Sequence, residues 1–222
     1  TSQIAGSAPK PLVINASAVG IGTSSPSAPL HIQADDNSDL LRFTVNANEV
    51  WAFKGASAVG SNDTVSFGIA GGTQAMAWDE AGRVTLPYQP GFSAEGTNYT
   101  QASGGLSTII CPSIWHNIGS HYNYSTGVFT APVAGRYQFS FWGLSYPHPN
   151  GQVNYIAFYK NSNPYSDAVQ FGGGYDQHVP VSGTVIMNLA ANDAVTHRYW
   201  SNSGGTAKAY NGQWTYSGQL LG

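Results

Sequence analysis

The feature that most constrains this chain is an alternation of apolar and polar residues at every second position in its second half. In residues 135–145, Tyr137, Phe139 and Phe141 alternate with polar side chains. This period of two is typical of a β-strand, whose successive side chains point to opposite faces of a sheet. Similar alternation returns at residues 153–159, 185–189 and 213–220. The sequence therefore predicts roughly eight strands, packed as a β-sandwich.

The strand expected over residues 135–145 is apolar on both of its faces. Trp142 and Leu144 lie on the face opposite Tyr137 and Phe139. Apolar residues on the outer face of a sandwich need a second cover, most simply another subunit. Charged residues make up only 9% of the chain, which is low for a soluble monomer. Both observations predict an all-β protein with an interface between subunits.

Composition divides the chain near Gln89. Residues 1–89 carry four Lys or Arg and seven Asp or Glu, whereas residues 90–222 carry four of each kind. The first part contains very short strand-like pieces, at residues 12–14, 30–32, 41–45, 50–53 and 65–69. Strands this short seldom bury a core within one chain. Three chains wound together could supply that core, so we expect residues 1–89 to form a short-stranded β stalk and residues 90–222 to form the head. A flexible linker is the weaker alternative, because large apolar residues recur throughout.

Several classes of function find no support in the residues. The net charge of −3 comes with no basic stripe, so we expect no nucleic-acid partner, and no apolar run is long enough to insert into a membrane. The single cysteine, Cys111, is expected to be a small buried side chain. The carboxylates are scattered and no Gly-x-Ser-x-Gly motif occurs, so we predict no catalytic residues and no cofactor. No metal site is predicted, although His148 or His178 on a three-fold axis stays open as an alternative.

Four segments of the second half resemble the jelly roll of the complement (C-one-q)/tumour-necrosis-factor family. They are PGFSA at residues 90–94, GVFTAPVAGRYQFSF at 127–141, NLAANDAV at 188–195 and YSGQLL at 216–221. They occur in the family's order and span essentially the whole of residues 90–222. One departure is Asn192, which stands where the family usually has glycine before Asp193. The resemblance implies a homotrimer.

Two phrases of the first half resemble bacteriophage tail fibres. They are VGIGTSSPSAPLHI at residues 19–32 and WDEAGRVTLPYQPGFSA at residues 78–94. The resemblance implies a receptor-binding tip on the phage virion, assembled in the host cytoplasm. Its partners would be other tail proteins, through a part that precedes Thr1, and a bacterial surface glycan, such as lipopolysaccharide or capsule, or an outer-membrane receptor.

The binding surface is expected in the longer loops at the far end of the jelly roll, at residues 103–114, 146–152, 171–178 and 200–213. These loops and their margins combine aromatic side chains with amides and hydroxyls, a mixture that suits sugars and also general binding surfaces. The candidate residues are Tyr146, His148, Asn150, Tyr175, Asp176, Tyr199, Trp200, Asn202 and Tyr210. Alternatively, these aromatic side chains only hold the loops in place by packing within them, or they pack at the interface between the subunits of a trimer.

Three other functions stay open at this stage. A structural fibre or collar protein would use the jelly roll only to trimerise the stalk. A polysaccharide depolymerase would need a carboxylate pair that the sequence does not display. A bacterial or animal lectin-like domain is the remaining alternative.

Overall fold

The computed structural model describes ten segments of the chain. They are residues 17–33, 39–45, 48–56, 64–69, 74–79, 81–96, 106–145, 151–172, 178–202 and 213–222. Every regular element in these segments is a β-strand, which confirms the predicted all-β class. The chain divides into two compact units, Thr1–Pro87 and Tyr88–Gly222. The strand expected at residues 12–14 lies outside the described residues.

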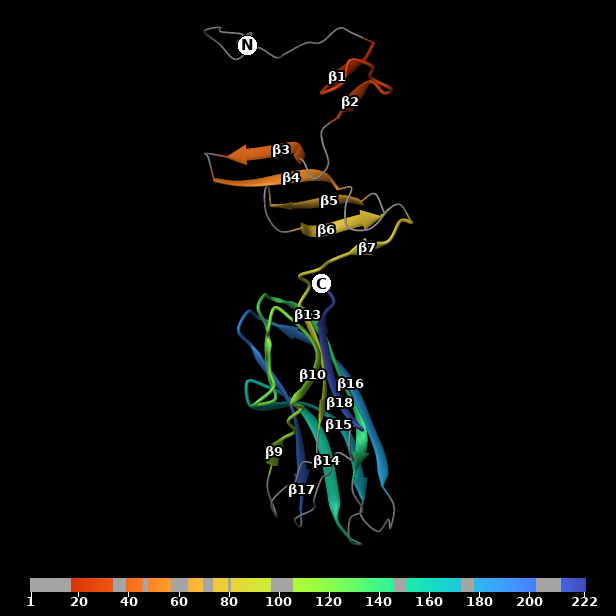
Figure 1. The fold of residues 1–222 in the computed structure, drawn as a ribbon. Coiled ribbons are helices and arrows are strands. Elements are labelled where there is room, and N and C mark those ends of the chain that lie inside the picture. The colour runs from red at the N-terminus through yellow and green to blue at the C-terminus, as the bar shows by residue number, and fades with distance from the viewer. Residues whose placement is uncertain are drawn as a thin grey trace. The chain divides into compact units, whose positions relative to one another are not determined.

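The first unit contains a short parallel pair and a five-stranded antiparallel sheet (Figure 1). Strands β1 (Val19–Ile21) and β2 (Leu30–Ile32) form the pair. The sheet, with strand order β3-β4-β5-β6-β7, is a meander in which each strand pairs with the next along the chain. Its strands are β3 (Asp39–Val45), β4 (Asn48–Ala56), β5 (Thr64–Ile69), β6 (Gln74–Asp79) and β7 (Val84–Thr85). These strands therefore pair within one chain, and the intertwining of three chains stays a prediction.

The second unit contains two antiparallel sheets. The first, here called the β13 sheet, has the order β10-β8-β18-β13-β16. The second, the β17 sheet, has the order β11-β12-β17-β14-β15, and β9 pairs with the free stretch of β17. The strands are β8 (Gly91–Gly96), β9 (Leu106–Thr108), β10 (Ser113–Ile118), β11 (Tyr122–Asn123), β12 (Val128–Thr130), β13 (Gly135–Ser145), β14 (Val153–Lys160), β15 (Asn163–Gly172), β16 (Val179–Leu189), β17 (Ala194–Ser201) and β18 (Trp214–Leu220).

The core of the second unit is aromatic and lies between the two sheets. The alternating residues of β13 supply Tyr137 and Phe139, both fully buried. Phe92 of β8 stacks on Tyr122 of β11, with ring centroids 4.3 Å apart, and meets Tyr216 of β18 edge-on at 4.9 Å. Offset and edge-on ring contacts of this kind stabilise a core beyond the apolar area that they bury. Cys111 is fully buried as predicted, and burial raises the pKa of its thiol to about 12.

The strand registers place the ends of eight strands at one end of the sandwich, here called the loop-bearing end. These strand ends are Gly96, Leu106, Ser145, Val153, Gly172, Val179, Ser201 and Trp214. Tight turns connect strands at the opposite end, where Asp193 accepts hydrogen bonds from Asn161 and from the backbone of Ala190. Its ion pair with Lys160, at 2.8 Å, helps to lower the pKa of this carboxyl to about 2.

Candidate functional site

The outward face of the β13 sheet exposes two large apolar side chains. Trp142 of β13 is 45% exposed and Ile186 of β16 is 55% exposed. Both follow from strand periodicity, since their neighbours in each strand, such as Phe141 and Met187, point into the core. Large apolar residues on the outer face of a regular sheet indicate a surface that another molecule covers.

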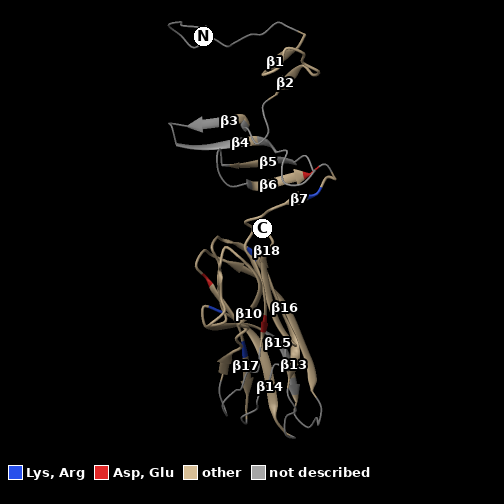
Figure 2. Ribbon diagram, in the orientation of Figure 1, with Lys and Arg blue, Asp and Glu red and all other residues tan. Residues whose placement is uncertain are grey.

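This face is nearly free of charge. Among the described residues it carries one carboxylate, Glu95, and one guanidinium, Arg136. Figure 2 shows how few charged residues lie on the described strands of the second unit. The outward positions of the five strands, read from register and burial, are Ser93, Glu95, Ser113, His116, Ile118, Arg136, Gln138, Ser140, Trp142, Leu144, Pro180, Ser182, Thr184, Ile186, Asn188, Thr215, Ser217 and Gln219.

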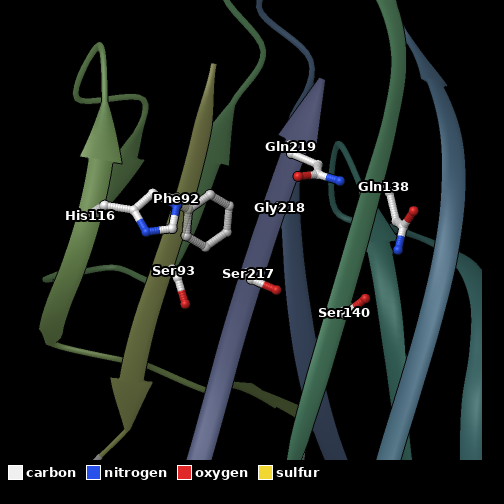
Figure 3. Close-up of a pocket in the computed structure, with 8 residues that line it drawn as sticks. All are labelled: Phe92, Ser93, His116, Gln138, Ser140, Ser217, Gly218 and Gln219. Atoms are coloured by element: carbon white, nitrogen blue, oxygen red, sulfur yellow. The ribbon is translucent and has the colours of Figure 1, made fainter. Parts of the chain in front are cut away.

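A shallow hollow of about 230 Å³ lies on the same face. It is lined by Phe92, Ser93, His116, Gln138, Ser140, Ser217, Gly218 and Gln219 (Figure 3). The serines come from β8, β13 and β18, which are neighbours in the sheet, and the Ser140 hydroxyl lies 2.9 Å from that of Thr184. The lining contains no Asp, Glu, Lys or Arg. It therefore offers neutral hydrogen-bond donors and acceptors, and no carboxylate for acid–base chemistry.

Two of the predicted binding residues, Trp200 and Asn202, lie at the loop-bearing end of the β17 sheet. Trp200 is half-buried and stacks on Tyr155 of β14, with ring centroids 5.0 Å apart and an angle of 17° between the planes. The exposed Asn202 accepts a hydrogen bond from the backbone N–H of Val153. Tyr155 was not predicted for the site, because its pairing with Trp200 depends on a register between strands 45 residues apart. The assignment of Trp200 and Asn202 to a binding surface stays a prediction.

The structure corrects the placement of Tyr199. This side chain is fully buried in the core, and its hydroxyl lies 2.7 Å from Oδ1 of Asn154, to which it donates. Tyr199 is therefore not available to a ligand at the surface. The other predicted residues, Tyr146, His148, Asn150, Tyr175, Asp176 and Tyr210, lie outside the described residues.

A buried histidine was missed by the sequence reasoning. His197 of β17 has no exposed surface, and the indole Nε1 of Trp214 donates a hydrogen bond of 3.1 Å to its Nε2. Burial lowers the pKa of His197 to about 3, so the imidazole is neutral at pH 7. The only signal in the sequence was the alternation of this segment, in which His197 occupies a position expected to face the core. Its role is structural.

Two further findings concern the described part of the chain. No group of three or more His, Cys, Asp or Glu side chains gathers there in a way that could hold a metal ion. Within the same residues, no helix is long and apolar enough to cross a membrane.

Comparison with known proteins identifies the second unit. The family model described as the C1q domain matches residues 91–221. This range covers more than half of the chain. The chain belongs to the C1q domain family. The predicted jelly-roll head is thereby confirmed, and a homotrimer is consistent with this family. C1q-domain proteins are non-enzymatic, which confirms that the chain is not an enzyme.

Individual relatives were found by sequence and by structure. The mouse collagen alpha-1(X) chain is 34% identical over 84 residues, a match that covers 37% of this chain and 11% of the collagen. The globular domain of zebrafish complement 1qA aligns with a TM-score of 0.48 and 20% identity, over 60% of this chain and 98% of that domain. Murine APRIL aligns with a TM-score of 0.44 and 7% identity, over 60% of this chain and 99% of APRIL.

These findings overturn the tail-fibre assignment. The family model is that of the C1q domain and one sequence relative is a mouse collagen chain, and neither is a phage protein. The predictions of a phage receptor-binding tip, of host attachment and of a place in the virion are therefore wrong. The bacterial glycan and tail-protein partners depended on the same resemblance and lose their support with it. The phrases that suggested phage were short and low in complexity, whereas the C1q-like segments span a whole domain.

Proposed function

We propose that this chain is a homotrimerisation module, in which the C1q domain holds three copies together through the outward face of the β13 sheet. The observation that carries the proposal is the exposure of Trp142 and Ile186 on a face with only two charged side chains among its described residues. Fully burying side chains of this size contributes roughly 1.5–3 kcal/mol each. Three copies around an axis would cover this face in every chain.

The polar side chains of the β13 sheet favour its outward face over that of the β17 sheet as the interface. Burying an ion costs several kcal/mol unless a partner compensates it. The outward face of the β17 sheet carries Arg198, whose guanidinium lies 4.5 Å from the ring centroid of Tyr159 and donates to Thr196 and Ser162. The face of the β13 sheet instead offers serine, threonine and glutamine side chains, which can exchange hydrogen bonds between copies.

The test replaces Ile186 with arginine in the full chain. Ile186→Arg places a charge within the proposed interface, so we expect the mass in solution to fall from three chains towards one. The matched control is Val133→Arg, since Val133 is 47% exposed in the bend between β12 and β13, outside the strands of this face. Light scattering coupled to size-exclusion chromatography measures both variants. A trimer that survives Ile186→Arg unchanged would contradict the proposal, as would equal dissociation of both variants.

A further inference from the structure

The five-stranded sheet of the first unit has one face made of large apolar side chains, here called the apolar face. Registry places Leu41, Phe53, Phe67 and Met76 opposite one another across β3, β4, β5 and β6. Trp78 lies two residues after Met76 on β6, and it pairs with Val84 of β7. Phe53 and Phe67 are in ring contact, with centroids 5.3 Å apart. The face therefore forms a continuous apolar surface across the sheet.

The opposite face differs in kind. Its described members include Ser66 of β5, Ala77 of β6 and Thr85 of β7, which register places side by side. These residues are small or polar, and Ser66 and Ala77 are buried. Alternation along the strands has thus sorted the large apolar residues onto one side, as in a sheet that packs against a second layer.

The described strands supply no such second layer. Strands β3 to β7 pair only with one another in a single sheet. On the apolar face Leu41 is 43% exposed, Phe53 37% and Val84 52%. The parallel pair β1–β2 likewise leaves Ile21 54% and Leu30 58% exposed. A one-layer sheet with this much exposed apolar surface is not stable in water unless another molecule covers it.

We propose that the same face of two further copies of this chain covers the apolar face, so that three sheets enclose a shared core. The inference rests on the proposed trimer of the C1q domain. Only residues 86–90 separate β7 from β8, so trimerisation of the C1q domain would tether three copies of the sheet to one another through short connections. Such tethering raises their effective concentration to the millimolar range. The three apolar faces are identical and can meet around one three-fold axis.

Two neighbouring residues on opposite faces supply the test. Val84 and Thr85 are both exposed in the single chain, but only Val84 belongs to the apolar face. Each is replaced by cysteine in the full chain, as Val84→Cys and Thr85→Cys, and treated with a short bismaleimide cross-linker. Cys111 contributes no background, because it is fully buried and its thiol has a raised pKa. Phe53→Cys is a second variant on the apolar face, in case the change at Val84 disturbs β7.

The amount of cross-linked product and the mass of the protein in solution are measured on the same samples. We expect a trimeric mass for every variant, with covalent dimers and trimers at Val84→Cys and Phe53→Cys and at least tenfold less product at Thr85→Cys. A trimeric protein in which all three variants cross-link equally, or not at all, would overturn the shared core and leave the trimeric head standing. It would assign the apolar face to a different protein or to a lipid surface. A monomeric mass for the unmodified chain would instead defeat the proposed function itself.

Discussion

At the scale of single residues, His197 shows most clearly how burial sets chemistry in this chain. Its imidazole is enclosed by the rings of Phe141, Trp214 and Tyr216, with the Tyr216 centroid 4.1 Å away. Because the indole of Trp214 donates to Nε2, the neutral ring carries its proton on Nδ1. Protonation of Nε2 would break this hydrogen bond and place a charge among aromatic rings, which explains the lowered pKa.

This arrangement predicts a loss of stability in acid. The pKa of His197 is about 3 in the folded chain, against 6.5 for an ordinary histidine. Below pH 6.5 the unfolded chain therefore binds a proton that the folded chain does not, and folding loses about 1.4 kcal/mol per pH unit until the pH nears 3. Denaturant unfolding at pH 7 and pH 5 measures this slope. In His197→Gln, whose amide oxygen can still accept from Trp214, we expect the difference between the two pH values to shrink.

Asp193 also has a shifted pKa, but its carboxyl titrates at lower pH than His197 does in the unfolded chain. Asp193 has a folded pKa of about 2, below its ordinary value of 3.8, so its contribution is complete above pH 3.8 and is lost only below it. It does not interfere between pH 7 and pH 5. An unchanged pH dependence in His197→Gln would show that other groups cause the acid effect.

Tyr199 shows at the same scale where sequence reasoning failed. Tyr199 and Trp200 are adjacent, and both were predicted to face a ligand. Adjacent residues of a strand point to opposite faces, and β17 runs on to Ser201, so only one of the two can face outward. The loop composition around Trp200 did not reveal that the strand continues through it.

At the scale of elements, two of the long strands were predicted from their alternation, whereas their partners were not. Residues 135–145 and 153–159 were expected as strands from their alternation, and β13 and β14 occupy Gly135–Ser145 and Val153–Lys160. The five-stranded meander of the first unit was not predicted, because each strand is short and its pairing depends on register rather than on composition. The apolar face of that sheet became visible only once Phe53, Phe67 and Met76 could be aligned.

Close approach between elements yields a prediction at Gly218 of β18. A Cβ added there would lie 2.6 Å from carbon atoms of both Phe92 and Phe139, inside the aromatic core. Gly218→Ala should therefore force these rings apart and lower the free energy of unfolding by about 1–3 kcal/mol. Gly172→Ala is the matched control, since its Cβ would meet only a backbone oxygen at 3.9 Å. Denaturant unfolding compares the two variants, and equal stabilities would contradict the packing described here.

At the scale of the whole molecule, the same proposed three-fold symmetry would apply to both units. The outward face of the β13 sheet and the apolar face of the first unit both expose large apolar side chains that the described part of the chain leaves uncovered. The proposed three-fold assembly would cover both. The low charge content and the apolar outer positions of residues 135–145 predicted an interface from sequence. The source of the chain was mistaken, because short phrases in the stalk were given weight beside a domain-length match in the head.

The most direct test of the central claim is the mass of the unmodified full chain in solution, measured by sedimentation equilibrium at neutral pH. The chain has a mass of 23.4 kDa. The proposed homotrimer predicts a single species of three times this mass, and this species should persist on dilution into the micromolar range. A species of one chain mass under these conditions would contradict it, and a stable dimer would equally exclude the three-fold arrangement.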